Sequence, residues 1–264
     1  MLRVNPDVQT VWNMRREGLP EDWSAEEELA LSADGIRKNP KSYGAWHHRV
    51  WVLAQRKVDL HRELDLCGLL LKQDARNFHC WNYRRHVASQ LGREQETAEL
   101  AFAAARIAEN FSNYSAFHHR SVYIKGAGSA RELAEAELAL TESAVFTEPD
   151  DQSAWWYRRF VYSWCEEQVL SEPETVNWLK ELYRTQRLAM TSLLEVEPES
   201  RWTLQELIYL CGRVGKLEES GEESDCLAER EGYLDRLTEL DPMHRRRYEY
   251  LRSQTSRKLG GGSQ

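Results

Sequence analysis

The sequence predicts an all-α protein, a right-handed α-α superhelix (solenoid) of about six helical hairpins. Three observations lead to this fold class. One segment recurs along the chain, and the stretches between its copies carry apolar residues at three- and four-residue steps. The β-branched alternation and Asn-Gly turns that are typical of sheet proteins are nowhere visible in the sequence.

The recurring segment is written five times. Its copies are NPDVQTVWNMRREGL from Asn5, NPKSYGAWHHRVWVL from Asn39, DARNFHCWNYRRHVA from Asp74, NFSNYSAFHHRSVYI from Asn110 and EPDDQSAWWYRRFVY from Glu148. Their aromatic residues are Trp12, Trp46, Trp81, Phe117 and Trp155, at steps of 34, 35, 36 and 38 residues. This period is typical of a two-helix unit. A weaker copy from Glu197 carries Trp202 in a shifted register, and Asp241 opens a last fragment, as expected of terminal repeats.

Each copy is predicted to open a helix. Four residues before the aromatic stand side chains that can accept from the free N–H groups of a first helical turn: Ser42, Asn77, Asn113 and Asp151. Val8 holds this place in the first copy, and its side chain has no atom that accepts a hydrogen bond. Because that copy begins so close to Met1, we expect the chain to be cut short upstream.

An arginine follows the aromatic by three residues in every copy, as Arg15, Arg49, Arg84, Arg120 and Arg158. This spacing puts the two side chains on one helix face, where they could stack together. The alternative is plain repeat architecture, with the aromatic wedged between hairpins and the arginine paired with a neighbouring carboxylate or carbonyl. Since every copy carries the pair, repetition favours this second interpretation.

The partner helices are predicted between the copies. They are the segments with apolar three- and four-residue spacing at 60–72, 97–110, 131–145 and 178–196. The segment Gly126-Ala127-Gly128-Ser129 is interpreted as a turn between helices, because no phosphate-loop or dinucleotide motif is present. The repeat domain is expected over 1–251 and a flexible tail or linker over 252–264, which ends in Gly-Gly-Gly-Ser-Gln.

Composition narrows the function. The net charge of −8 disfavours a bulk electrostatic grip on nucleic acid or on an anionic membrane. The five cysteines form no C-x-x-C pair and suit a reducing compartment, and neither a membrane span nor a secretory signal is visible, so we expect a cytoplasmic protein.

The pairs His47-His48 and His118-His119 suggest a metal, but adjacent helical residues diverge by about 100°, so we expect no metal site in this chain.

Lys41 differs from its counterparts in the other copies. It directly precedes the Ser42 cap, where the helix already presents partial positive charge, so a cation there suggests a bound anion. Arg76 holds the same place in the next copy, and Tyr43 and the pair Phe78-His79 follow the two cations. The sequence leaves two interpretations open, a solvated loop lysine and a site for a phosphorylated ligand.

The copies resemble the repeats of the protein prenyltransferase α-subunit family. The stretches NPKSYGAWHHRVW, DARNFHCWNYRR, NFSNYSAFHHRS and DDQSAWWYRRF carry the likeness, which spans the chain to about Leu251 and is closest to the Rab geranylgeranyltransferase (type 2) branch. The resemblance implies an α subunit, inactive alone, that wraps a β subunit holding zinc, the isoprenoid and the cysteine substrate. It implies transfer of geranylgeranyl groups to C-terminal cysteines of Rab GTPases that an escort protein presents.

The resemblance also assigns roles to residues. Lys41 matches the family's lysine that helps to hold the isoprenoid diphosphate, here geranylgeranyl diphosphate at the subunit interface. Tyr43 and the Phe78-His79 pair match the aromatic residues at the mouth of the site. Arg76 is added to these candidate ligand-binding residues because it holds the place of Lys41 in the next copy. Farnesyltransferase-type α subunits have a glutamine where this chain has Gly44, which favours the Rab type.

Two alternatives remain open at this stage. The chain could be a tetratricopeptide-like scaffold that grips a peptide without catalysis, because both are arrays of helical hairpins of similar period. It could also be the α subunit shared by farnesyltransferase and type 1 geranylgeranyltransferase.

Overall fold

The structure, a computed structural model, describes residues 1–126, 130–171, 175–217 and 222–259, and these form two compact units, 1–127 and 128–264. Over the described residues the regular structure is helical, as predicted. Part of the turn expected at 126–129, and the tail from 260 onward, lie outside them. No described helix is both long and apolar enough to cross a bilayer.

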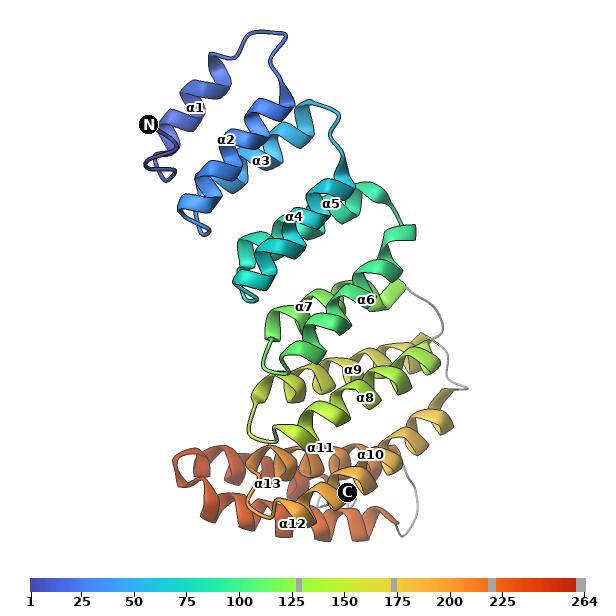
Figure 1. Cartoon of the computed structure of the whole chain (residues 1–264). Coiled ribbons are helices and arrows are strands. Elements are labelled where there is room, and N and C mark those ends of the chain that lie inside the picture. The colour runs from blue at the N-terminus through green and yellow to red at the C-terminus, as the bar shows by residue number, and fades with distance from the viewer. Residues whose placement is uncertain (127–129, 172–174, 218–221, 260–264) are drawn as a thin grey trace. The chain divides into compact units, whose positions relative to one another are not determined.

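The first unit contains α1 (Gln9–Glu17), α2 (Ala25–Lys38), α3 (Tyr43–Gln55), α4 (Leu60–Gln73), α5 (Phe78–Leu91), α6 (Glu94–Glu109), α7 (Tyr114–Tyr123) and the 3₁₀ turn η1 (Ile124–Gly126). Helices α2 and α3, α4 and α5, and α6 and α7 pack as successive hairpins (Figure 1). Helix α1 packs against α3. The copies of the repeated segment therefore form α1, α3, α5 and α7.

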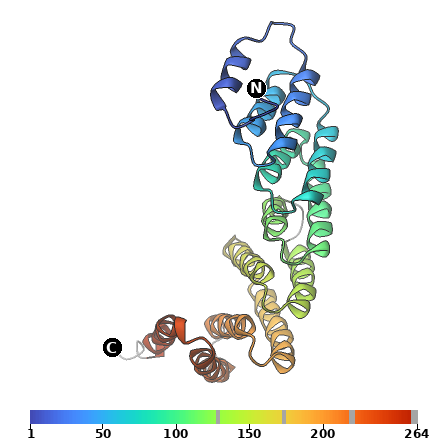
Figure 2. The same cartoon turned by 60° about the vertical axis from the view of Figure 1, so that its left-hand side comes forward.

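The second unit contains α8 (Ala130–Thr147), α9 (Gln152–Ser171), α10 (Val176–Val196), α11 (Arg201–Leu217), α12 (Glu222–Leu240), the 3₁₀ turn η3 (Pro242–His244) and α13 (Arg245–Leu259). Its helices also pack with their neighbours in sequence (Figure 2). Helix α13 runs through the first part of the segment expected to be a tail. Within the described residues, the hairpins of both units give the predicted number of about six.

Side-chain caps fix where the repeated helices begin. Ser42 accepts from the backbone N–H of Ala45, Asn77 from those of His79 and Cys80, and Asn113 from that of Ala116. Val8 makes no side-chain cap bond, as its chemistry requires. These contacts confirm the caps that the sequence predicts, each of which supplies an acceptor for an otherwise unpaired donor.

The repeat tryptophans tie each helix to the loop before it. The indole N–H donates to the carbonyl oxygen six residues earlier: Trp12 to Pro6 (2.8 Å), Trp46 to Pro40 (2.8 Å), Trp81 to Ala75 (2.9 Å) and Trp155 to Pro149 (2.9 Å). All four side chains are buried. The aromatic column of the repeat is therefore core that also orders the loop.

The structure confirms the architectural interpretation of the repeat arginines. Arg49 donates to the Glu63 carboxylate and to the Leu29 carbonyl, and the side chain is buried. The aromatic ring that its guanidinium faces is that of Tyr83, in the next repeat, and the ring nearest Arg84 is that of Phe102. For Arg49 and Arg84, the other interpretation, stacking on the repeat's own tryptophan, is therefore wrong, because a buried guanidinium must first satisfy its donors.

Gly44 is required by close packing of α3 against the first copy. A Cβ atom there would lie 2.5 Å from Trp12 Cδ1 and 2.9 Å from the Pro6 carbonyl oxygen. At Gly68, in the middle of α4, the nearest atom to an added Cβ would be Phe102 Cε2 at 3.8 Å. The two glycines thus form a matched pair, one crowded and one open.

We expect Gly44→Ala to lower the free energy of unfolding by about 1–3 kcal/mol, as overpacking does. Gly68→Ala should leave it unchanged or raise it, because alanine is the better helix former. Urea denaturation of both variants checks this. Equal stability of Gly44→Ala and the parent chain would contradict the close approach of Trp12.

Candidate functional site

The residues that the sequence singles out lie at the N-terminal ends of α3 and α5. Tyr43 and Phe78 are the first residues of these helices, held in place by the Ser42 and Asn77 caps. The Asn77 side chain also donates to the carbonyl oxygen of Pro40 at 2.9 Å, which joins the two loops. Equivalent positions of neighbouring repeats are thereby brought side by side.

Three of these residues form an aromatic cluster. The His79 ring lies 4.3 Å from that of Tyr43, edge to face, and 4.0 Å from that of Phe78, centroid to centroid. Tyr43 is 70% exposed and Phe78 48%, whereas His79 is buried beneath them. The cluster therefore presents two aromatic faces to the outside, supported by a buried imidazole.

Lys41 stands at the edge of this cluster. Its Nζ lies 3.8 Å from Asp74 Oδ2, and its side chain is 67% exposed. Burial, and then the positive charge of Lys41, lower the pKa of His79. At neutral pH the imidazole is therefore uncharged, and Lys41 supplies the positive charge of this cluster. The Asp74 carboxylate provides part of the negative charge that the sequence led us to expect at this lysine.

Arg76 is not brought into the cluster. Its guanidinium donates to the Ser112 carbonyl oxygen at 2.7 Å and lies 5.5 Å from the ring centre of Tyr114, both in the following repeat. The predicted cationic lip is thus divided, with Lys41 beside the aromatic rings and Arg76 one repeat further on. An exposed ammonium beside two exposed rings suits a ligand with an anionic head and an apolar chain.

Three of the four paired histidines lie beside protein side chains. His48 Nε2 lies 2.9 Å from Glu28, His119 Nε2 lies 2.7 Å from Glu99, and His118 Nδ1 lies 3.2 Å from Arg85. Among the described residues, no group of three or more His, Cys, Asp or Glu could hold a metal ion.

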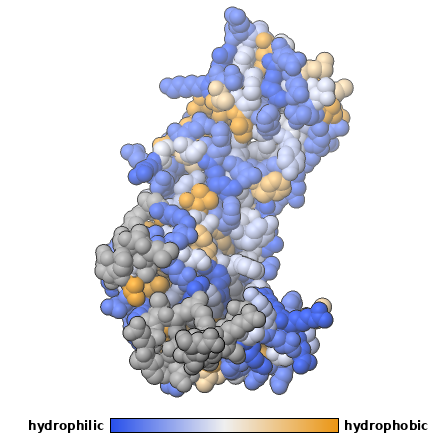
Figure 3. Space-filling view, turned by 180° about the vertical axis from the view of Figure 1, so that it is seen from behind, coloured by the Kyte–Doolittle hydropathy of each residue, from blue (hydrophilic) through white to orange (hydrophobic). Residues whose placement is uncertain are grey.

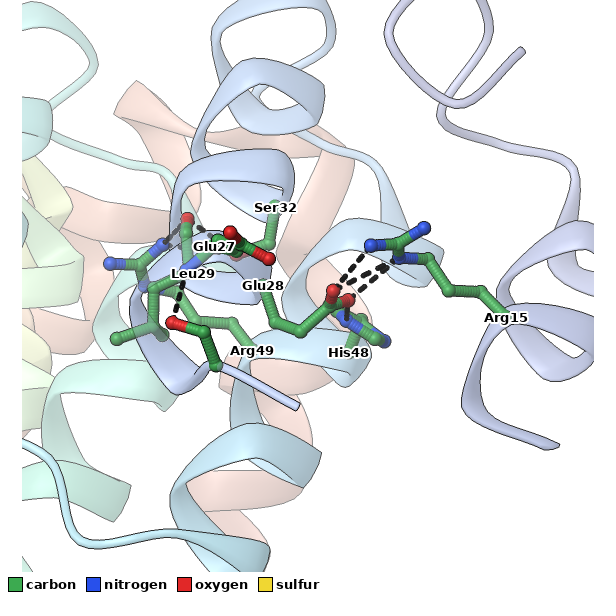
Figure 4. Close-up of polar contacts among 8 residues, drawn as sticks. Arg15, Glu27, Glu28, Leu29, Ser32, His48 and Arg49 are labelled. Atoms are coloured by element: carbon green, nitrogen blue, oxygen red, sulfur yellow. Dashed lines mark hydrogen bonds and ion pairs between the residues drawn. The ribbon is translucent and has the colours of Figure 1, made fainter. Parts of the chain in front are cut away.

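Buried glutamates join consecutive repeats, which the sequence reasoning missed. Glu28 accepts from Arg15 and His48, as Figure 4 shows, and Glu63 accepts from Arg49 and from the hydroxyl of Tyr83. Glu99 accepts from Arg84 and His119. In each case the His or Tyr follows the glutamate by 20 residues, as Tyr157 follows Glu137. This constant spacing was the signal available in the sequence.

These glutamate clusters belong to the scaffold because they are sealed from solvent. Glu28, Glu63, Glu99, His48 and His119 are all buried. Burial raises the pKa of Glu99, but hydrogen bonds from His119 and Arg84 outweigh it and hold the pKa at about 2. Burial lowers the pKa of His119 and of His48 more than their glutamate partners raise it. The histidines are therefore neutral donors in the folded chain.

We expect acid to destabilise the fold through these groups. His48 and His119 have folded pKa values below the usual 6.5, so the unfolded chain takes up protons first and stability falls as the pH drops below about 6.5. Glu99 adds a further loss as the pH falls from about 4.5 toward 2.

The double variant His48→Tyr/His119→Tyr tests this expectation. Tyr83 already holds the equivalent position and donates to its glutamate at 2.7 Å. The loss of thermal stability between pH 7 and 5 should be smaller in the variant than in the parent. Identical pH profiles would contradict the assignment.

Comparisons with known proteins agree with the arrangement of hairpins. The family described as "Protein prenyltransferase alpha subunit repeat" matches residues 25–56, 60–91, 97–126 and 134–165, which take in the hairpins from α2–α3 to α8–α9. A solved structure titled "Candida albicans protein geranylgeranyltransferase-I complexed with GGPP" is similar in fold. Its TM-score is 0.50 at 16% identity, over 91% of this chain and 86% of that one. These findings define the class, an all-α protein of prenyltransferase-type repeats.

Curated relatives extend the likeness to nearly the whole chain. The geranylgeranyl transferase type-2 subunit alpha of Saccharomyces cerevisiae is 31% identical over 278 residues, covering 96% of this chain and 83% of its own length. That of Schizosaccharomyces pombe is 30% identical over 95% and 82%, respectively. The chain belongs to the protein prenyltransferase α-subunit family.

Animal relatives are more similar but longer. The geranylgeranyl transferase type-2 subunit alpha of Sus scrofa is 44% identical over 182 residues, which are 61% of this chain and 32% of that protein. The chain thus matches about a third of the length of the animal relatives.

Proposed function

We propose that this chain is the α, non-zinc subunit of a heterodimeric Rab geranylgeranyltransferase that acts in the cytoplasm and is inactive without its β subunit. The enzyme would transfer geranylgeranyl from geranylgeranyl diphosphate to C-terminal cysteines of Rab GTPases presented by an escort protein. One observation carries the proposal. The two yeast relatives named geranylgeranyl transferase type-2 subunit alpha align over nearly the whole chain.

The cluster around Lys41 supports a part in the reaction. When the thioether forms, the bond between the isoprenoid C1 and the diphosphate oxygen breaks, and negative charge develops on the departing diphosphate. An ammonium fixed at a helix N-terminus offsets that charge and lowers the barrier. Tyr43 and Phe78 would flank the first isoprene unit, with His79 as their support. Zinc would come from the β subunit and would activate the cysteine thiol there.

The chain's own surface also supports a partner. Large apolar side chains are exposed along the first unit, among them Tyr43, Phe78 and Tyr114, each at the start of a repeated helix. On the face shown in Figure 3, apolar side chains form separate patches among hydrophilic ones. Aromatic residues at the same position of successive repeats suit a partner that contacts several repeats at once. Such a partner would bury more than about 2,000 Å², as obligate interfaces do.

Co-expression with a type 2 β subunit from the same organism tests the proposal. A stoichiometric complex that contains zinc and requires both chains for transfer is expected. The chain expressed alone should be poorly soluble and should aggregate at high concentration, so that experiments on it alone need dilute solution. A stable, monodisperse monomer that does not bind the β subunit would favour the alternative of a non-catalytic scaffold. If the chain assembled preferentially with a farnesyltransferase β subunit, the other alternative would be favoured, in which it is the α subunit shared by farnesyltransferase and type 1 geranylgeranyltransferase.

A further inference from the structure

A groove lies between α4 and α6. It encloses about 640 Å³ and is lined along α4 by residues from His61 to Lys72 and along α6 by residues from Gln95 to Arg106. Leu64 and Phe102 form its apolar part, and Leu69, 61% exposed, stands on its edge. The groove lies along the first helices of two hairpins, whereas Lys41 and Tyr43 belong to the loop and helix of another hairpin.

Gly68 leaves this groove open without a packing reason. An added Cβ would meet only Phe102 Cε2, at the ordinary contact distance of 3.8 Å. Glycine in a helix interior is unfavourable, and the same register five residues after the repeat glutamate holds Ala33, Ala104 and Glu142 elsewhere. At this position, which lines the groove, the chain lacks the helix stability that alanine would add.

Arg106 places a cation in the same groove. At its register, seven residues after the repeat glutamate, the other repeats have Gly35, Leu70 and Ala144. The Arg106 side chain is only 11% exposed, and within the described residues its Nε has no hydrogen-bond partner. One of its terminal nitrogens pairs with Glu109. The guanidinium lies 5.5 Å from the centre of the Phe102 ring, so Arg106 places a positive charge at the groove wall beside its apolar part.

The charge in the groove is uneven. Arg84 is neutralised by two hydrogen bonds to Glu99, so it adds little attraction for a ligand. Asp65 lies toward the start of α4, whereas Lys72 and Arg106 lie in the last turns of α4 and α6. The groove thus has an apolar middle and one cationic end.

We propose that the α4–α6 groove binds a short amphipathic helix of a partner protein. Its apolar side chains lie along Phe102 and Leu69, and an Asp or Glu at one end binds Arg106 and Lys72. The span from His61 to Lys72 is about 16 Å at the helical rise, which is about three turns of a bound helix. Helices commonly dock in this way, with anchors at three- and four-residue steps.

Synthetic peptides test the proposal with the full-length chain. The probe is a defined set of fluorescein-labelled 12-residue peptides with Leu or Phe at helical spacing and Glu at one end, each paired with the same peptide carrying Gln. Fluorescence anisotropy should show acidic members binding at least tenfold more tightly than their Gln counterparts.

Variants of the groove provide the controls. Arg106→Leu restores the side chain that Leu70 has at the same register, so it should fold normally and abolish the preference for Glu. Gly68→Met should weaken binding at least tenfold by filling the groove, and Gly68→Ala should weaken it less. Glu109→Gln should strengthen the preference for Glu, because it removes the carboxylate that pairs with Arg106. Circular dichroism melting confirms that each variant is folded. The proposal is wrong if no Glu peptide is preferred over its Gln partner, or if the preference survives Arg106→Leu. Because no transfer is measured, the result is independent of the proposed enzymatic function.

Discussion

Replacing Glu99 by Ala is expected to lower the free energy of unfolding by about 3–5 kcal/mol, because it leaves a buried cation without its partner. The Glu99 carboxylate accepts from Arg84 at 2.7 Å through both oxygens, from His119 at 2.7 Å and from Gln95 at 3.0 Å. Arg84 is 6% exposed and Glu99 fully buried. Water cannot replace the lost carboxylate at this depth, so the guanidinium keeps its desolvation cost.

Glu109→Ala on the same helix is the matched control. Glu109 pairs with Arg106 but is 59% exposed, and such surface pairs contribute about 0–1 kcal/mol. Urea denaturation of the two variants should therefore separate them widely. Similar losses would show that the buried clusters do not hold neighbouring repeats together. Glu99→Gln should fall between the two, because it keeps the shape and loses the charge.

Lys41→Ala is expected to reduce geranylgeranyl transfer by the reconstituted heterodimer tens-fold to hundreds-fold, if the diphosphate contact contributes about 2–3 kcal/mol. Folding and affinity for the β subunit should be unchanged, because the lysine is two-thirds exposed and its Nζ lies 3.8 Å from the partly exposed Asp74 carboxylate. Lys41→Arg should restore only part of the rate, since a planar fork places its charge differently from a compact ammonium.

Three further variants sharpen this test. His79→Ala should have a smaller effect, because a neutral imidazole supports the two rings without adding charge. Arg76→Ala should also have a smaller effect, because its guanidinium is directed to Ser112 and Tyr114. Lys38→Ala removes another exposed lysine of the same unit and should have no effect on transfer. Single-turnover transfer and titration with a non-hydrolysable isoprenoid analogue separate binding from chemistry.

The fold was predictable because its determinants are local and repeated. Caps such as Ser42 and Asn77 show where helices begin, and the tryptophan column shows the period. The role of the arginines was predictable only as one of two options. Choosing between them required the partner glutamates, which for Arg15, Arg49 and Arg84 lie 13–15 residues away on another helix and have no signature next to the arginine.

The candidate site was predictable in part for the same reason. The equivalence of repeats places Tyr43 near Phe78 and His79, because corresponding helix ends of adjacent hairpins lie side by side. The equivalence of repeats does not predict that Asp74 lies beside Lys41 or that Arg76 contacts the next repeat. Both contacts depend on the direction of the side chains. Gly44 suggested substrate type in the sequence, whereas its surroundings show a tight contact with Trp12.

One measurement tests the central claim most directly: transfer of labelled geranylgeranyl from its diphosphate to a Rab GTPase, with escort protein, by this chain purified together with a type 2 β subunit. The account predicts transfer that requires both chains and is lowered at least tenfold by Lys41→Ala but not by Lys38→Ala. Transfer by the β subunit alone at the same rate, or a folded heterodimer with no transfer to any Rab, would contradict it.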